Sequence, residues 1–136
     1  MTGVQTCALP IYICALPAFW TGILYDRSSL AAAWDLVADW SAEEREQLRI
    51  EAPRLGLATP FRGKKLGEIA LVALELSRAG LRRRARLDSG GEDEGHYLVP
   101  LFEFAHSGKT AAERLLDDYA TRWRGSVDPI YAEGAY

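Results

Sequence analysis

Apolar residues recur along most of this chain at steps of three and four positions, the spacing that places side chains on one face of an α-helix. A helix is predicted from Asp26 or Ser28 to Trp40, with an apolar stripe made of Leu30, Ala33, Trp34, Val37 and Ala38. A longer helix is predicted over residues 65–87, with an apolar face made of Leu66, Ile69, Ala70, Ala73, Leu76 and Gly80. No alternating strand pattern of useful length occurs, so the chain is expected to be mainly α.

Capping residues predict where two further helices begin. Ser41 with Glu44, and Thr110 with Glu113, have the spacing of a capping box, in which a hydroxyl and a carboxylate satisfy the free N–H groups of a helix start. Asp26 and Ser28 are the corresponding single-residue candidates for the helix that ends at Trp40.

Prolines are expected to mark other helix boundaries. Pro17 predicts a first helix over residues 17–25, because proline loses no hydrogen bond in a first turn. Pro53 and Gly56 are expected to end the helix that starts after Ser41. Pro129 disfavours helical backbone at Asp128, the residue before it.

Length and composition are those of a single globular unit. The chain has 136 residues, which is one domain at most. About half of the residues are hydrophobic and a quarter are charged, as in ordinary soluble proteins. The net charge of −3 gives no indication of a nucleic-acid partner. The basic run 82–86 falls at a predicted helix end, where cations complement the helix dipole, although contact with a phosphate remains the alternative.

The apolar run from Ala8 to Leu24 does not predict a membrane segment. It contains Pro10 and Pro17 and has no basic residue before it, whereas a signal peptide needs a charged start. A spanning helix needs roughly 20 unbroken apolar residues. Neither a signal peptide nor a membrane anchor is therefore expected.

Residues 1–11 are interpreted as an artefact. The run from Met1 to Ile11 back-translates into a common sequencing-library adapter with GTG as the start codon. Such scars are excluded from fold reasoning, so the natural sequence is expected to begin near Tyr12 or Ile13 and to be truncated upstream. Residues 12–136 are expected to form one helical region.

On that interpretation Cys14 is the one native cysteine. A single cysteine cannot form an internal disulfide, so a reducing, cytoplasmic location is expected. Its side chain is expected to be a small buried apolar group, and a regulatory redox role is the alternative.

The residue types that carry most enzyme chemistry are sparse. His96 and His106 have no cysteine beside them, so no zinc site or other metal site is predicted. Asp35 and Asp39 share a helix face, which is expected to be solvated rather than to do acid–base work. No arrangement of nucleophile and base can be argued from two histidines in different elements.

Several short segments, taken in order, resemble the C-terminal region of the plant-type glutamate–cysteine ligases. The segments are residues 14–26 (CALPAFWTGILYD), 34–37 (WDLV), 39–40 (DW), 43–45 (EER), 60–63 (PFRG), 79–81 (AGL), 110–116 (TAAERLL) and 125–131 (GSVDPIY). The resemblance covers nearly the whole chain but only the tail of the family's much longer protein. In the family a run containing Gly-Pro-Trp precedes this region, and it is absent here.

The resemblance implies the fold and the chemistry of a longer parent protein. The parent would be an α+β ligase with a glutamine-synthetase-like fold, whose antiparallel sheet binds ATP, Mg²⁺ and glutamate, and cysteine would be its second amino-acid substrate. ATP would phosphorylate the γ-carboxylate of glutamate, and the amine of cysteine would then displace phosphate. The metal-binding carboxylates of the family lie upstream, so no catalytic residue and no cofactor site is expected in this chain, and the chain alone is expected to be inactive.

Three residues are candidates for contact with substrate in such a parent. Trp20 and Tyr25 could line a pocket, although packing in the core is the alternative for both. Arg62 could bind a carboxylate or phosphate, and a salt bridge within a loop is its alternative. Two other functions stay open: a stand-alone helical module that binds a partner protein, and a related carboxylate–amine ligase with another acceptor.

Overall fold

The computed structural model describes residues 9–133, and the side chains of residues 13–132. Over these residues the chain is mainly α, as predicted, with one small hairpin. The elements in chain order are α1 (Leu9–Leu24), α2 (Arg27–Val37), α3 (Ala42–Leu55), the 3-10 turn η1 (Gly56–Ala58), β1 (Pro60–Phe61), β2 (Lys64–Lys65), α4 (Leu66–Arg84), the 3-10 turn η2 (Glu94–Leu98), α5 (Val99–Ser107), α6 (Ala111–Ala120) and α7 (Asp128–Glu133).

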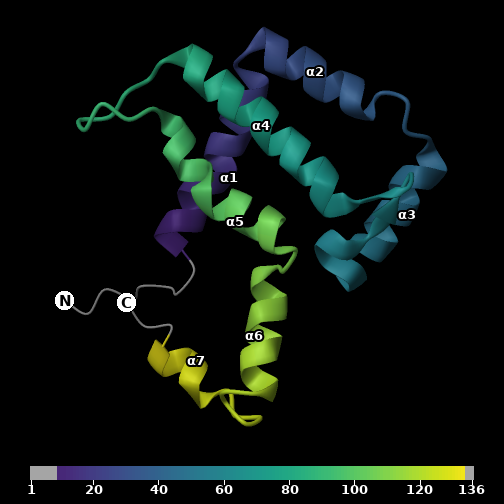
Figure 1. Cartoon of the computed structure of the whole chain (residues 1–136), viewed down its shortest axis with the longest axis vertical. Helices are drawn as coiled ribbons and strands as arrows, with labels where there is room; N and C mark the ends of the chain where they lie inside the picture. The colour runs from purple at the N-terminus through teal and green to yellow at the C-terminus, as the bar shows by residue number, and fades with distance from the viewer. Residues whose placement is uncertain (1–8, 134–136) are drawn as a thin grey trace.

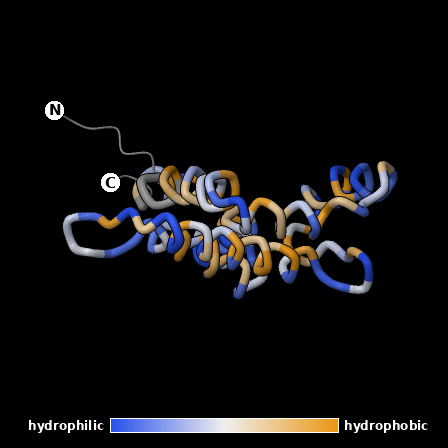
Figure 2. Tube along the Cα trace, turned by 90° about the horizontal axis from the view of Figure 1, so that it is seen from above, coloured by the Kyte–Doolittle hydropathy of each residue, from blue (hydrophilic) through white to orange (hydrophobic). Residues whose placement is uncertain are grey.

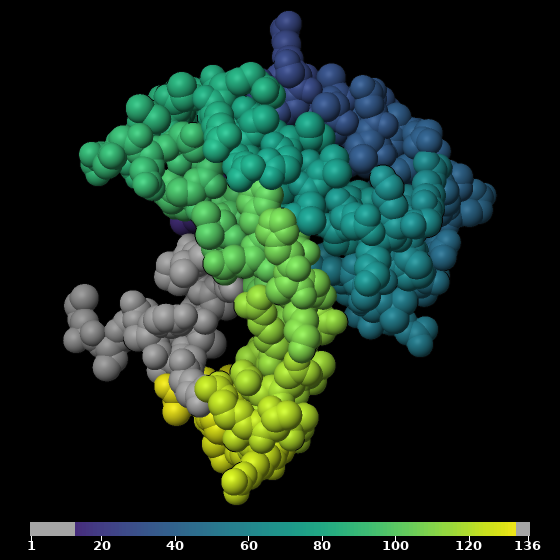
Figure 3. All heavy atoms as spheres, viewed as in Figure 1, coloured from purple at the N-terminus to yellow at the C-terminus, as the bar shows by residue number. Residues whose placement is uncertain are grey.

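Helix α4 is the centre of the arrangement (Figure 1). Helix α1 crosses it and also contacts η2 and α5, while α2 packs on α1 and α4. Helix α3 lies near the start of α4, beside the hairpin of β1 and β2. Helices α6 and α7 form a narrow arm that projects from this body (Figure 3). Seen from above, the body is thin, with apolar residues along the helices and polar residues at the outer turns (Figure 2).

The core lies where α1 and α4 meet η2 and the start of α5. Its centre consists of Ala18, Leu81 and Leu98, and the two leucines are fully buried. Phe19 and Phe102 pack against this centre while remaining partly exposed. Burying a leucine side chain contributes about 1.5–3 kcal/mol, so these few residues hold the three helices together.

Small residues let α1 and α4 approach closely. A Cβ atom built on Gly22 would lie 2.2 Å from the carbonyl oxygen of Ser77, so only glycine fits there. The buried Ser77 hydroxyl donates to the carbonyl of Phe19 at 2.8 Å. In the same way the Ser29 hydroxyl of α2 donates to the carbonyl of Leu76 at 2.7 Å. Helices α1 and α2 are therefore each joined to α4 by hydrogen bonds to backbone carbonyls, in addition to the core between α1 and α4.

The predicted helix caps are confirmed. Ser41 with Glu44 and Thr110 with Glu113 each form a capping box. Asp26, not Ser28, caps α2, and its carboxylate accepts from the N–H of Ser29 at 2.8 Å. These interactions are local in sequence, which is why the pattern of residue types was sufficient to predict them.

The proline boundaries were predicted wrongly. Helix α1 begins at Leu9 and includes Pro17. Helix α3 includes Pro53 and continues to Leu55, where Gly56 is its C-cap as predicted. Both prolines lie on exposed sides of their helices, where the carbonyl deprived of its N–H partner can bind water instead. Asp128 is also helical, because it opens α7 and Pro129 then occupies the first turn.

The predicted apolar faces are only partly buried. In α2 the stripe does not enter the core, since Trp34 is 66% exposed and Ser29 is the buried residue instead. In α4 the buried face contains Gly80 as expected but is rotated toward Leu74, Ser77 and Leu81. Periodicity therefore identified both helices, while the neighbours that each packs against decided which face is inside.

Among residues 9–133 no helix combines the length and the apolar character that crossing a bilayer requires.

Candidate functional site

Helix α1 presents a continuous apolar stripe to solvent. Ile13, Leu16, Trp20 and Leu24 follow one another at steps of three or four residues, and each is between 50% and 60% exposed. The ring of Trp20 meets that of Phe19 edge to face, with centroids 5.3 Å apart. The candidate Trp20 therefore lies on an outer surface and is not packed in the core of the described chain.

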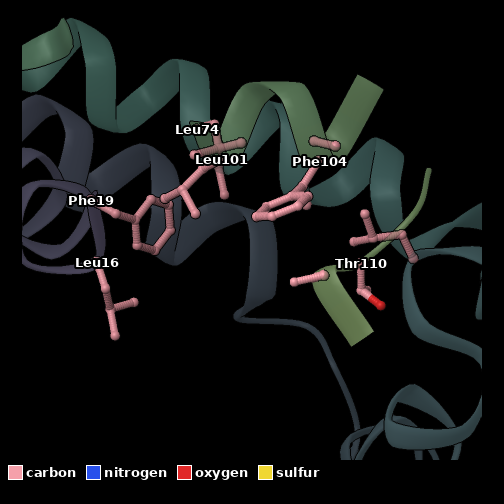
Figure 4. A pocket seen from close by; sticks show the side chains of 11 residues that line it. Leu16, Phe19, Leu74, Leu101, Phe104 and Thr110 are labelled. Atoms are coloured by element: carbon pink, nitrogen blue, oxygen red, sulfur yellow. The ribbon is translucent and has the colours of Figure 1, made fainter. Parts of the chain in front are cut away.

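An apolar hollow of about 440 Å³ lies beside this stripe (Figure 4). It is lined by Leu16, Phe19, Leu57, Ala70, Ala73, Leu74, Leu101, Phe104, Ala105, Thr110 and Ala111. Thr110 is the one residue of this lining with a polar side chain, and its hydroxyl donates to Glu113 at 2.7 Å as part of the capping box. A hollow of this kind suits apolar side chains and offers nothing to a phosphate or to the charges of an amino acid.

The local backbone places Arg62 at the tip of a two-residue hairpin turn. Arg62 has φ 48° and Gly63 has φ 76°, the left-handed pair that a tight turn between β1 and β2 requires. A non-glycine residue in this region is strained. The strain at Arg62 is offset by the contacts of its side chain.

The Arg62 guanidinium bridges the junction of α2 and α3. It donates to Glu44 at 2.6 and 2.7 Å, to the carboxylate of Asp39 at 2.7 Å and to the Asp39 carbonyl at 2.9 Å. Hydrogen bonds from Arg62 and from the Ser41 backbone lower the pKa of Glu44 to about 2. The same carboxylates raise the pKa of Arg62 above its usual range. These contacts form the salt bridge that was the alternative expectation for Arg62. A substrate-binding role for Arg62 stays a prediction.

The three candidate substrate contacts do not converge within the described residues. Tyr25 is 75% exposed, and the Arg84 guanidinium lies over its ring at 5.4 Å. Arg84 ends α4, whereas Arg62 precedes its start, and a helix of 19 residues is about 28 Å long. Tyr25 and Arg62 are thus near opposite ends of α4, and their shared role in substrate contact also stays a prediction.

Basic residues in the last turn of α4 are paired with acidic groups. Arg83 donates to Asp26 at 2.6 Å, and Arg84 lies 3.7 Å from Glu94. The Arg83 guanidinium, together with the Ser29 N–H, holds the pKa of Asp26 well below its usual range. These ion pairs give the arginines a structural role that does not require contact with a phosphate.

Three residues that could bind a metal ion lie close together in the structure, although the sequence did not predict this. Ligand atoms of Asp88 and Glu92, on the loop that follows α4, and of His96 in η2 all lie within 4.8 Å of one another. Backbone N–H groups of Glu92 and Gly90 lower the pKa of Asp88. The three residues are spaced four positions apart, which would place them on one face of a helix. In a loop the same spacing does not determine whether the side chains are close.

This cluster does not fit the ATP and Mg²⁺ that the family resemblance implies. Mg²⁺ prefers an octahedron of oxygen ligands and is bound with substrate phosphates, whereas one of these three ligands is an imidazole. The adjoining Arg84 is engaged with Glu94 and with the Tyr25 ring. Whether a cofactor binds elsewhere in this region is not tested by this cluster, and the expected absence of a cofactor site stays a prediction.

Cys14 was expected to be buried, and this expectation is wrong. It is a free cysteine on the solvent-exposed surface of α1. The expectation followed the average behaviour of cysteine, whereas the packed side of α1 is set by Ala15, Ala18 and Gly22.

Comparison with known proteins gives a consistent set of relatives. A family model described as glutamate–cysteine ligase family 2 matches residues 7–133. Over 124 residues, or 91% of its length, this chain is 46% identical to glutamate–cysteine ligase A, chloroplastic, of Oryza sativa subsp. indica. The match covers 24% of the rice protein. The chloroplastic ligases of Arabidopsis thaliana and Nicotiana tabacum are 46% and 44% identical over the same share of the chain, which covers 23% of each.

Two expectations are affected by these relatives. All three are chloroplastic proteins, which contradicts the expected cytoplasmic location. A lone cysteine excludes an internal disulfide but cannot distinguish one reducing compartment from another. The family match also begins at residue 7, within the range interpreted as adapter. Residues 1–8 of that range lie outside the described residues, so the adapter interpretation stays a prediction.

The chain spans about a quarter of the length of the curated relatives it matches. Since the family model covers nearly all of the chain and the identity to these relatives is high, the chain belongs to glutamate–cysteine ligase family 2.

Proposed function

We propose that this chain is the helical region of a ligase that joins the γ-carboxylate of L-glutamate to the amine of L-cysteine in an ATP-dependent reaction. The observation that carries the proposal is its identity of 46% to a rice glutamate–cysteine ligase over 91% of the chain. Within that enzyme the region would serve as a scaffold, and the reacting groups would come from the rest of the protein.

The exposed apolar surface supports a scaffold role. Monomeric proteins seldom leave large contiguous apolar patches in contact with water. Here the stripe of α1 continues through Leu16 into the apolar hollow, and Leu30 and Trp34 of α2 are also exposed. We propose that the remaining part of the ligase packs against this surface.

ATP and Mg²⁺ belong to the proposed whole enzyme and not to this region. The hollow beside α1 is apolar, and the Arg62 guanidinium already bonds Asp39 and Glu44. We therefore expect the isolated chain to turn over no ATP, whether or not glutamate and cysteine are present.

The test is a chimera in which this chain replaces the matching 124-residue region of the rice ligase. We expect formation of γ-glutamylcysteine that requires ATP, glutamate and cysteine, and no such activity from the isolated chain. A folded but inactive chimera would contradict the proposed role, and so would ATP turnover by the isolated chain.

A matched pair of variants tests whether the apolar stripe of α1 contacts the rest of the ligase. Replacing Leu16 and Trp20 together by Glu should abolish the activity of the chimera, because charges would enter the proposed contact. Leu87→Glu changes an exposed leucine outside the stripe and should leave activity close to that of the parent chimera. Replacing cysteine by other amines in the same assay identifies the acceptor.

A further inference from the structure

We propose that Asp88, Glu92 and His96 form a binding site for a divalent transition metal ion of the Zn²⁺ type. Their ligand atoms lie within 4.8 Å of one another. Two ligand atoms bound to one zinc ion at about 2.1 Å can be at most about 4.2 Å apart. Small rotations of the two exposed carboxylates would therefore complete the site.

The choice of metal follows from the ligand types. Imidazole nitrogen favours zinc, cobalt, nickel and copper, whereas Mg²⁺ and Ca²⁺ prefer oxygen ligands alone. Two carboxylates and one imidazole provide three protein ligands, which leaves a fourth position for water.

The hydrogen bond of His96 leaves one ring nitrogen free to bind a metal. Its Nδ1 lies 2.7 Å from the backbone carbonyl of Asp93. A carbonyl only accepts hydrogen bonds, so Nδ1 carries the proton and Nε2 keeps its lone pair. Histidine ligands in metal sites commonly donate their other nitrogen to a backbone carbonyl in this way. The ring also lies against Tyr97, with centroids 3.9 Å apart, which restricts its rotation.

The loop backbone holds the carboxylates near the imidazole. Leu87 and Asp93 form an antiparallel bridge, and the N–H of Asp88 donates to the carbonyl of Glu92 at 2.9 Å. The Asp88 carboxylate accepts from the N–H groups of Gly90 and Glu92 at 2.7 and 3.1 Å. The loop is therefore closed on itself before any ion binds.

A fourth residue gives an independent indication of a cation. Glu94 lines the same hollow of about 180 Å³, and its buried Oε2 accepts no hydrogen bond within the described structure. The nearest charge recorded for it is Arg84, with Nη1 3.7 Å away. A buried carboxylate oxygen without a hydrogen bond is costly, and a cation in the hollow would reduce that cost.

The charge balance of the hollow is favourable. Its lining contains the three carboxylates of Asp88, Glu92 and Glu94 and the single guanidinium of Arg86. Even when Arg84 beside Glu94 is counted, the acidic groups outnumber the basic ones, and bound metal would join the loop to η2. Ligand binding to the folded state raises its stability in proportion to the logarithm of metal concentration.

The experiment titrates the metal-free full chain with ZnCl2 by calorimetry and with CoCl2 by visible absorption. We expect one ion per chain and an increase in melting temperature on adding Zn²⁺. His96→Ala should weaken binding at least tenfold and abolish the thermal shift. Asp88→Asn with Glu92→Gln should have the same effect, and Mg²⁺ should not compete with Co²⁺.

Two controls test the assignment. His106→Ala removes the other histidine, which lies on the exposed side of α5, and Cys14→Ser removes an exposed thiol that is itself a potential zinc ligand. Both should bind Zn²⁺ like the parent chain. Undiminished binding by a folded His96→Ala variant, loss of binding in either control, or failure of the parent to bind would each overturn the proposal. The readout is metal binding, so it is independent of ligase activity.

Discussion

Gly22 and Gly80 face each other where α1 crosses α4, so closely that a Cβ atom on Gly80 would lie 1.9 Å from the carbonyl oxygen of Gly22. The same Cβ would lie 2.9 Å from the Ser29 hydroxyl of α2. One small residue on α4 therefore sets the spacing of three helices. It also fixes which side of α1 is turned outward, and hence where the exposed stripe lies.

Substitution of Gly80 should be much more damaging than substitution of another glycine of the same helix. Gly80→Ala forces a methyl group into backbone atoms, and overpacking of this kind typically costs about 1–3 kcal/mol. We expect a loss of at least about 2 kcal/mol in the free energy of unfolding, measured with urea.

Gly67→Ala is the matched control. Its Cβ would lie 3.4 Å from Leu57, an ordinary contact, and alanine favours helix over glycine by up to about 1 kcal/mol. This variant should be as stable as the parent or slightly more stable. Equal losses in the two variants would contradict the account of the crossing.

The core should depend on very few side chains. Leu81→Ala removes a fully buried side chain where α1 and α4 meet η2 and the start of α5 and should cost about 2–5 kcal/mol. Leu87→Ala, at a site 66% exposed, should change the free energy of unfolding by less than about 0.5 kcal/mol. Urea denaturation of both variants measures the difference, and similar losses would show that Leu81 is not central.

Stability should fall in acid because of Glu44. Its pKa is about 2 in the folded chain, below the ordinary 4.5, so the folded state favours the ionised carboxylate. This contribution is complete above pH 4.5 and is lost as the pH falls from there toward 2. Asp26 acts in the same direction, since Arg83 lowers its pKa below 3.8. Melting temperatures should therefore decline below pH 4.5.

Replacement of Arg62, the ion-pair partner of Glu44, tests the cause of the fall in melting temperature in acid. Arg62→Gln should raise the pKa of Glu44 toward its ordinary value, as followed by the NMR shifts of its side chain. It should also flatten the acid decline in melting temperature. An unchanged titration of Glu44 in this variant would exclude Arg62 as the cause.

The exposed apolar stripe on α1 should give the isolated chain a surface that binds other apolar groups. We expect it to bind an apolar fluorescent dye and to self-associate as its concentration rises. Replacing Leu16 and Trp20 by Glu should reduce both effects with a change in unfolding free energy below about 1 kcal/mol, because both side chains are at least half exposed. Leu87→Glu is the control and should leave dye binding unchanged.

The features that could be predicted from the sequence are those with local causes. The hydroxyl of Ser41 and the carboxylate of Glu44 are three residues apart and cap α3 without help from other elements. The helical character of residues 66–84 follows from its periodicity in the same way. Family membership was accessible too, because the segments that carry it run through the chain.

Features that depend on distant neighbours were not predictable. Trp34 belongs to an apolar stripe, yet no described element covers it, and Ser29 is buried because the Leu76 carbonyl is there to accept its hydrogen bond. His96 meets Asp88 only because the loop after α4 closes on itself. No period in the sequence specifies either relationship.

The pairing of α1 with α4 also has a consequence for biosynthesis. The hydrogen bond from Ser77 to Phe19 joins residues 58 positions apart. At about 5–20 residues per second, the ribosome needs roughly 3–12 s to make the segment between them. Throughout that interval the nascent α1 lacks its packing partner, and both its inner and outer apolar sides are open to chaperones.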